Sequence, residues 1–297
     1  MTAFKVNGIE IDAEELGEAT GTPLVLIRGL GTQRTAWPEE FLRGMVARGH
    51  RVITFDNRDA GLSTKFHEAG SVNIAEAMGR AARGEPIGAS YSVDDMALDV
   101  VYLLDALEVE TAHVAGISMG GMIAQLLAAR HGERLRSLVS IMSSSGAPGL
   151  PGPTPEAAAA LMSRPEDPGD RESVIRHSVW VLKVIGSPGY PSGDDHLRAV
   201  AERAYDRCYC PDGITRQMLA ILTGGGRAEL LRQIRVPTLV IHGVDDPLIP
   251  IEAGVDTARR IPGAALRLIP GMGHDLAPGL IPTLVESIAE HTAAAEG

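Results

Sequence analysis

Short runs of aliphatic and β-branched residues alternate along the chain with longer stretches in which apolar residues recur every three or four positions. The short runs are typical of strands buried in a parallel sheet, and the longer spacing is typical of amphipathic helices. The pattern therefore predicts an α/β fold with a mostly parallel sheet of about eight strands flanked by helices. The expected strands are residues 4–6, 9–13, 23–27, 51–55, 112–117, 135–142, 237–242 and 265–269, and the expected helices between them include 93–107, 119–131 and 280–292.

Residues 146–227 break this alternation, because none of their apolar runs resembles a buried strand. The segment begins with a stretch rich in Pro and Gly and ends near three consecutive glycines, which is typical of flexible connections. Its amphipathic patterns need a surface to cover. We therefore predict that residues 1–145 and 228–297 form the core and that residues 146–227 are inserted as a helical cap. Four helical patterns lie within the insertion, around residues 155–162, 171–185, 194–208 and 214–222.

Composition narrows the class of protein. Hydrophobic residues make up 44% of the 297 residues and charged residues 22%, which is ordinary for a globular protein. The net charge of −11 argues against nucleic acid or an anionic membrane as the main partner. The first residues lack the pattern of a signal peptide, and no apolar run approaches ~18 residues. We expect a cytoplasmic protein that acts on a small molecule, and a homo-oligomer is compatible with the sequence.

The clearest chemical motif is Gly116-Ile117-Ser118-Met119-Gly120. A G-x-S-x-G pattern alone carries little weight, since a chain of this composition gives about 0.2 chance matches. Here the motif follows an expected strand and precedes an expected helix, which is the setting of a nucleophile elbow. Glycines let the turn lift the serine hydroxyl above the sheet, and the next N–H, that of Met119, then points at a developing oxyanion. The alternative is a serine that only caps the helix.

A serine nucleophile needs a base, and nine histidines are available. His274, in Gly-Met-Gly-His-Asp, follows the last expected strand, and a loop at that end of a strand reaches the crevice where α/β sheets bind ligands. We therefore assign His274 as the base. His50 and His113, at the ends of strands, are expected to be surface or capping residues, and His242 is expected to have a structural role.

The acid that orients the histidine is Asp245 or Asp246, at the end of the expected strand 237–242. The loop after the strand 135–142, the other position for such an acid, contains no carboxylate. One of the two aspartates therefore serves only to form the Asp-Asp-Pro turn. The chain order of serine, aspartate and histidine is that of α/β-hydrolases.

Together, these motifs resemble the α/β-hydrolase superfamily. The resemblance implies that the acid is Asp246, directly before Pro247, and that Leu30 in Ile-Arg-Gly-Leu-Gly donates its N–H to the oxyanion together with Met119. Many members carry histidine where this chain has Arg28. The turn from Phe55 to Thr64, with the acidic Asp59, is most similar to that of aclacinomycin methylesterase-like esterases.

We therefore expect a cofactor-free serine esterase in which Ser118, Asp246 and His274 form the triad. The alternative activities are those of a perhydrolase of the haloperoxidase type, a lactonase or a hydrolase of carbon–carbon bonds. A further alternative is a small-molecule receptor that has the same fold and triad but turns over its ligand slowly. Cys208 and Cys210 form neither a disulfide framework nor a zinc site by themselves, and no metal is expected. Because the triad and the oxyanion donors come from the core, we expect the cap only to shape the pocket and exclude water.

Overall fold

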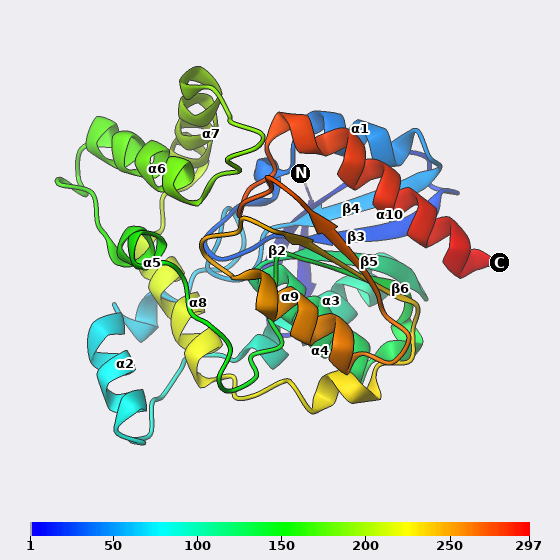
Figure 1. Cartoon of the computed structure of the whole chain (residues 1–297), viewed down its shortest axis with the longest axis horizontal. Helices are drawn as coiled ribbons and strands as arrows, with labels where there is room; N and C mark the ends of the chain where they lie inside the picture. The colour runs from blue at the N-terminus through cyan, green and yellow to red at the C-terminus, as the bar shows by residue number, and fades with distance from the viewer. Residues whose placement is uncertain (1) are drawn as a thin grey trace.

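The computed structural model describes residues 2–297, and one eight-stranded sheet organises the chain (Figure 1). The strands lie in the order β1-β2-β4-β3-β5-β6-β7-β8, with antiparallel pairing only where β2 meets β1 and β4. This confirms the predicted α/β class and the number of strands. Their bounds are β1 (Thr2–Val6), β2 (Ile9–Leu16), β3 (Thr22–Ile27), β4 (His50–Phe55), β5 (Ala112–Ile117), β6 (Leu135–Ile141), β7 (Thr238–Gly243) and β8 (Ala265–Ile269).

Helices cover both faces of the sheet, and the alternation along β3 shows how. Val25 and Ile27 pack in one buried cluster with residues of α3 and α4. Leu24 and Leu26 point to the opposite face and pack with residues of α1 and α10. Strands buried on both faces explain the continuous apolar runs in the sequence. The helices outside residues 146–227 are α1 (Glu39–Val46), α2 (Ile74–Ala82), α3 (Val93–Ala106), α4 (Met119–Arg130), α9 (Ile251–Arg260) and α10 (Ile281–Glu296).

Between β6 and β7 the chain forms four helices, where the four helical patterns of the sequence lie. Local signals set their starts: the Thr154 and Asp170 side chains accept backbone N–H bonds at the beginning of the first two helices. Figure 1 shows all four helices to the left of the sheet, on the same side as α2 and opposite the C-terminus. They are α5 (Pro155–Met162), α6 (Arg171–Ile185), α7 (Asp194–Arg207) and α8 (Pro211–Thr223).

Two arginines, one buried and one with its side chain 14% exposed, tie these helices to buried carboxylates of the core. Arg207, at the end of α7, contacts the carboxylates of Asp12 and Asp56, each at 2.7 Å. Arg216, on α8, forms two bonds of 2.8 Å with Asp59, and its side chain is only 1% exposed. Buried ion pairs of this kind are costly to break, because one charge is then left without a partner. They therefore fix α7 and α8 against strand β2 and the loop after β4.

The expectation that His50 and His113 lie at the surface was wrong. They are 6% and 0% exposed, and their rings meet edge to face at 5.8 Å. The reason is α10, which covers this part of the sheet: His50 Nε2 lies 3.1 Å from Thr292 Oγ1. His113 Nδ1 is 2.8 Å from Ser137 Oγ on β6. Burial lowers the pKa of His113 to about 4, so this ring is neutral near pH 7.

Two further features bear on the expectations from composition. Within residues 2–297, none of the helices combines the length and the apolar character that crossing a membrane requires. Cys208 and Cys210, in the short link between α7 and α8, are both free thiols.

Candidate active site

The turn between β5 and α4 has the geometry of a nucleophile elbow. Ser118 has a φ of 56° and a ψ of −120°, a conformation that a residue with a side chain rarely adopts. Its N–H donates to the Ile141 carbonyl at 3.0 Å, and Ser143 Oγ donates to the Ser118 carbonyl at 2.8 Å. Strain of this kind persists only where the surroundings enforce it, as at functional sites.

The glycines around Ser118 are required by close approach of the backbone. A Cβ at Gly116 would lie 2.1 Å from the Gly120 carbonyl oxygen, and one at Gly120 would lie 2.2 Å from the Ile27 oxygen. At Gly121 it would meet the Ser143 side chain at 2.5 Å. Side chains at these three positions would therefore collide with β3, with the first turn of α4 and with the loop after β6.

The structure brings the three predicted catalytic side chains together. His274 Nε2 lies 3.0 Å from Ser118 Oγ, and His274 Nδ1 lies 2.7 Å from Asp246 Oδ2. The side chains of Asp246 and His274 are 0% and 7% exposed. Since a carboxylate only accepts, Nδ1 carries the proton and donates it, and Nε2 is left to accept from the Ser118 hydroxyl. This is the tautomer in which the imidazole can take up the serine proton.

The two neighbouring aspartates have separate tasks. Asp246 Oδ1 accepts the N–H groups of Leu248 and Ile249 at 2.9 and 2.8 Å, which leaves its Oδ2 for the histidine. Asp245 is exposed, and its Oδ2 accepts the Gly271 N–H at 2.7 Å. Asp245 therefore supports the turn that precedes the histidine and does not reach the ring.

The loop after β3 lies against the nucleophile. A Cβ placed on Gly29 would be 3.1 Å from Ser118 Cβ, so the backbone of this loop runs directly beside the serine. Among residues 2–297, no acceptor pairs with the N–H of Leu30 or of Met119. Met119 is the first residue of α4, where the N–H groups have no partner within the helix. Both predicted donors are thus available to a developing oxyanion.

Arg28 precedes this loop and, unlike Arg207 and Arg216, does not pair with a carboxylate of residues 2–297. Its guanidinium carbon lies 5.0 Å from the centre of the Trp37 ring, and its Nε and Nη1 atoms are buried with no partner found in the described part of the chain. Burial lowers the pKa of Arg28 to about 10, so it stays protonated near pH 7. Its positive charge is therefore held by packing on an aromatic face instead of by a carboxylate.

The sequence did not indicate that α6 also holds the histidine loop. The His274 N–H donates to the Ile185 carbonyl at 2.7 Å, and the Gly273 N–H donates to Ser187 Oγ at 2.9 Å. The Ser187 hydroxyl in turn donates to Asp275, and burial raises the pKa of that carboxyl. The bonds from the end of α6 and from Ser187, two residues further on, join residues almost ninety positions apart, which no local pattern reveals.

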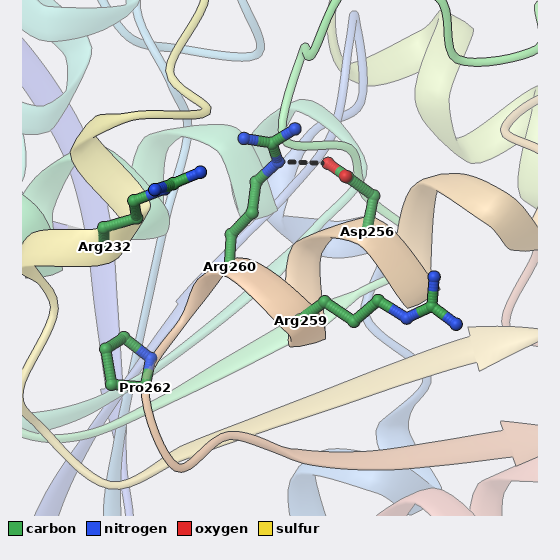
Figure 2. Close-up of a pocket in the computed structure, with 5 residues that line it drawn as sticks. All are labelled: Arg232, Asp256, Arg259, Arg260 and Pro262. Carbon is green, nitrogen blue, oxygen red and sulfur yellow. Dashed lines mark hydrogen bonds and ion pairs between the residues drawn. The ribbon is translucent and has the colours of Figure 1, made fainter.

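A hollow of about 470 Å³ lies elsewhere, at the end of α9 (Figure 2). Arg260 there bonds to Asp256 at 2.6 Å, and Arg259 extends in another direction. The hollow is lined by Arg232, Asp256, Arg259, Arg260 and Pro262, and by none of Ser118, Asp246 and His274. It is therefore separate from the triad. No group of three or more His, Cys, Asp or Glu side chains within residues 2–297 is arranged to hold a metal ion.

Comparison with known proteins agrees with this geometry. The family model described as alpha/beta hydrolase fold matches residues 22–177. The chain belongs to the α/β-hydrolase family. This α/β-hydrolase is 30% identical to the rhodomycin D methylesterase DauP of Streptomyces sp. strain C5, and the match covers 95% of each chain. It is also 30% identical to the rhodomycin D methylesterase DnrP of Streptomyces peucetius, and this match again covers 95% of each chain. The predicted resemblance to this family and to its methylesterases is confirmed.

Solved structures support the fold. A meta-cleavage product hydrolase from Pseudomonas fluorescens IP01 superposes on this α/β-hydrolase with a TM-score of 0.76, at 20% identity, covering 99% of this chain and 98% of the other. A thermophilic esterase from Thermogutta terrifontis gives a TM-score of 0.71 at 23% identity and covers both chains completely. At such identities the likeness concerns the fold alone.

Proposed function

We propose that this α/β-hydrolase is a serine esterase that cleaves a carboxylic ester through an acyl-enzyme. The observation that carries the proposal is the hydrogen-bond chain from Asp246 through His274 to Ser118, with links of 2.7 and 3.0 Å. A base that is held in the correct tautomer and contacts a hydroxyl is the arrangement that turns serine into a nucleophile.

In the proposed reaction Ser118 Oγ attacks the ester carbonyl while His274 Nε2 takes its proton. The N–H groups of Leu30 and Met119 stabilise the oxyanion of the tetrahedral intermediate. When the intermediate collapses, His274 returns the proton to the departing alcohol and leaves an acyl group on Ser118. Water then attacks the acyl group and gives a proton to His274, and the carboxylic acid departs as Ser118 regains its hydrogen.

The proposed substrate is a small or medium apolar ester, with a methyl ester as the first candidate. Two rhodomycin D methylesterases at 30% identity support this choice. Apolar side chains are exposed on three of the inserted helices: Leu161, Met162, Trp180 and Ile214 are 37%, 42%, 42% and 38% exposed. We propose that residues 146–227 act as a cap that surrounds such a substrate and excludes water.

Labelling with a fluorophosphonate and turnover of p-nitrophenyl acetate test the proposal. We expect the wild-type protein to be labelled at Ser118 and to turn over the ester. Ser118→Ala removes only the nucleophile, so it should fold normally and lose ~10³-fold or more in kcat. Near-normal hydrolysis by this variant would overturn the assignment. Labelling without turnover would indicate the slow receptor, and peracid formation from acetate and hydrogen peroxide would indicate the perhydrolase.

A further inference from the structure

The loop that carries Leu30 is anchored on both sides of that residue. On one side the Arg28 carbonyl accepts from Asn57 Nδ2 at 3.0 Å. On the other side the Gly31 N–H donates to Gln217 Oε1 at 2.7 Å. Between these two bonds, the direction of the Leu30 N–H depends on only a few backbone dihedrals.

Gln217 lies on α8 of the inserted segment and is completely buried. While its Oε1 accepts from Gly31, its Nε2 donates to the Arg58 carbonyl at 2.7 Å. Each end of the amide thus has a partner of the opposite kind, so only one orientation of the side chain satisfies both. Through this amide, α8 connects the loop after β3 with the loop after β4.

The seating of α8 leaves the amide little freedom. Ile214, one turn earlier, lies so close to the loop that a Cβ on Gly31 would be 2.7 Å from its Cγ1. Gly31 has a φ of 64°, which also favours glycine. Arg216, next to Gln217, pairs with Asp59 and fixes the helix along its axis. The helix therefore presents the Gln217 carbonyl at a set position to the Gly31 N–H.

We propose that Gln217 is a positioning residue for the oxyanion hole, so that the inserted segment takes part in building the catalytic site as well as covering it. This inference rests on the proposed esterase function. Donors act in catalysis by being fixed where negative charge develops, before the reaction begins. Without the Gln217 carbonyl, the Gly31 N–H loses its partner and the segment around Leu30 loses its bond to α8. The bonds from Thr32 to the Gly29 carbonyl then remain, but they lie within the loop itself and do not fix it against a neighbouring element. The chemical step suffers, and substrate binding does not.

The chain offers a matched set of variants. Gln217→Leu removes both hydrogen bonds at nearly constant volume, whereas Gln217→Glu keeps an oxygen for the Gly31 N–H. Gln33→Leu is the control, because Gln33 is also buried, at 5% exposure, and its Nε2 also joins core to insertion. Its Nε2 donates to the carbonyls of Ala204 and Cys208, at 2.7 and 2.8 Å, and its Oε1 accepts from Arg207 at 2.7 Å, so none of its bonds involves Gly31.

Three measurements on each variant give the test: kcat and KM for p-nitrophenyl butyrate, the rate at which a p-nitrophenyl alkylphosphonate modifies Ser118, and the melting temperature. For Gln217→Leu we expect kcat and the modification rate to fall about 10-fold or more, with KM within about threefold. Gln217→Glu should lie between this variant and the wild type. Gln33→Leu should lose melting temperature but keep both rates within about threefold.

Equal rates for Gln217→Leu and wild type, or an equal loss of rate in Gln33→Leu, would overturn the proposal. If Gln217→Leu does not fold, Gln217→Glu is compared with Gln33→Leu by the same criteria. If wild-type Ser118 does not react with the phosphonate, the esterase proposal fails separately. Hydrogen exchange at the Gly31 amide then decides the role of Gln217: faster exchange in Gln217→Leu than in wild type supports it, and equal exchange refutes it.

Discussion

Replacing Asp59 by Asn tests how firmly the inserted helices are held on the core. Asp59 has a φ of 65°, and asparagine tolerates this conformation, so the substitution removes the charge without straining the backbone. It leaves the guanidinium of Arg216, 1% exposed, without a carboxylate, since the asparagine amide oxygen and the Gly70 carbonyl at 2.8 Å are both neutral acceptors. Removing one member of a buried ion pair costs about 3–5 kcal/mol.

The expected decrease in melting temperature follows from this loss of free energy. An unfolding entropy of about 2.1 cal/mol/K per residue gives roughly 0.6 kcal/mol per kelvin for this chain, so Asp59→Asn should melt about 5–8 °C below wild type. Thermal unfolding followed by circular dichroism at pH 7 measures the shift. The double variant with Arg216→Met removes the unpaired charge and should melt above the single variant.

The control is Glu39→Gln in the Glu39–Arg43 pair, whose side chains are 74% and 76% exposed. An exposed pair of this kind contributes well under about 1 kcal/mol, so its loss should shift the melting temperature by no more than about 1 °C. If Asp59→Asn shifts it no further than that, or if Arg216→Met does not restore stability in the double variant, the idea of a buried ionic attachment is wrong.

Three further predictions concern the triad, acid stability and the cap. Asp246→Asn should lower kcat for p-nitrophenyl acetate by ~10³-fold or more because His274 loses its acceptor, while Asp245→Asn should cost less than about 10-fold; equal losses would contradict the assignment. His113 takes up a proton near pH 6.5 in the unfolded chain but only near pH 4 in the native chain. Lowering the pH from 7 to 5 should therefore reduce the free energy of unfolding, measured in urea, by up to about 2 kcal/mol through this residue. In His113→Gln this part of the decrease should be absent. Trp180→Ala should raise KM for a bulky aromatic ester relative to an acetate ester; an unchanged ratio with a lower melting temperature would mean that Trp180 only packs within the cap.

The sequence was sufficient for the sheet and for most helices, because burial on both faces produces continuous apolar runs and periodic patterns. The helices α1, α2 and α9, of 8 to 10 residues, are absent from the prediction, since so few turns give a weak periodic signal.

The candidate triad could also be placed from sequence, because each member follows a strand at the end where loops converge. The choice of Asp246 over Asp245 needed the family resemblance, since both flank the same turn. Gln217 and Ser187 could not be found, because each contacts a loop far away in the chain and neither belongs to a local motif. The burial of His113 likewise depends on α10, which only the folded chain brings to that strand.

The ionic attachment of α7 and α8 also limits which segments of this protein could be exchanged with those of a relative. A foreign cap segment grafted between β6 and β7 would need arginines that reach the sites of Arg207 and Arg216. Without them, Asp56 and Asp59 would remain in the core as carboxylates with no cation, at 0% and 1% exposure, and Asp12 would keep only Arg34 of the core. Chimeras that exchange residues 146–227 should therefore be designed as a unit with these acidic positions, because the inserted segment and the core share one set of charges instead of being separable modules.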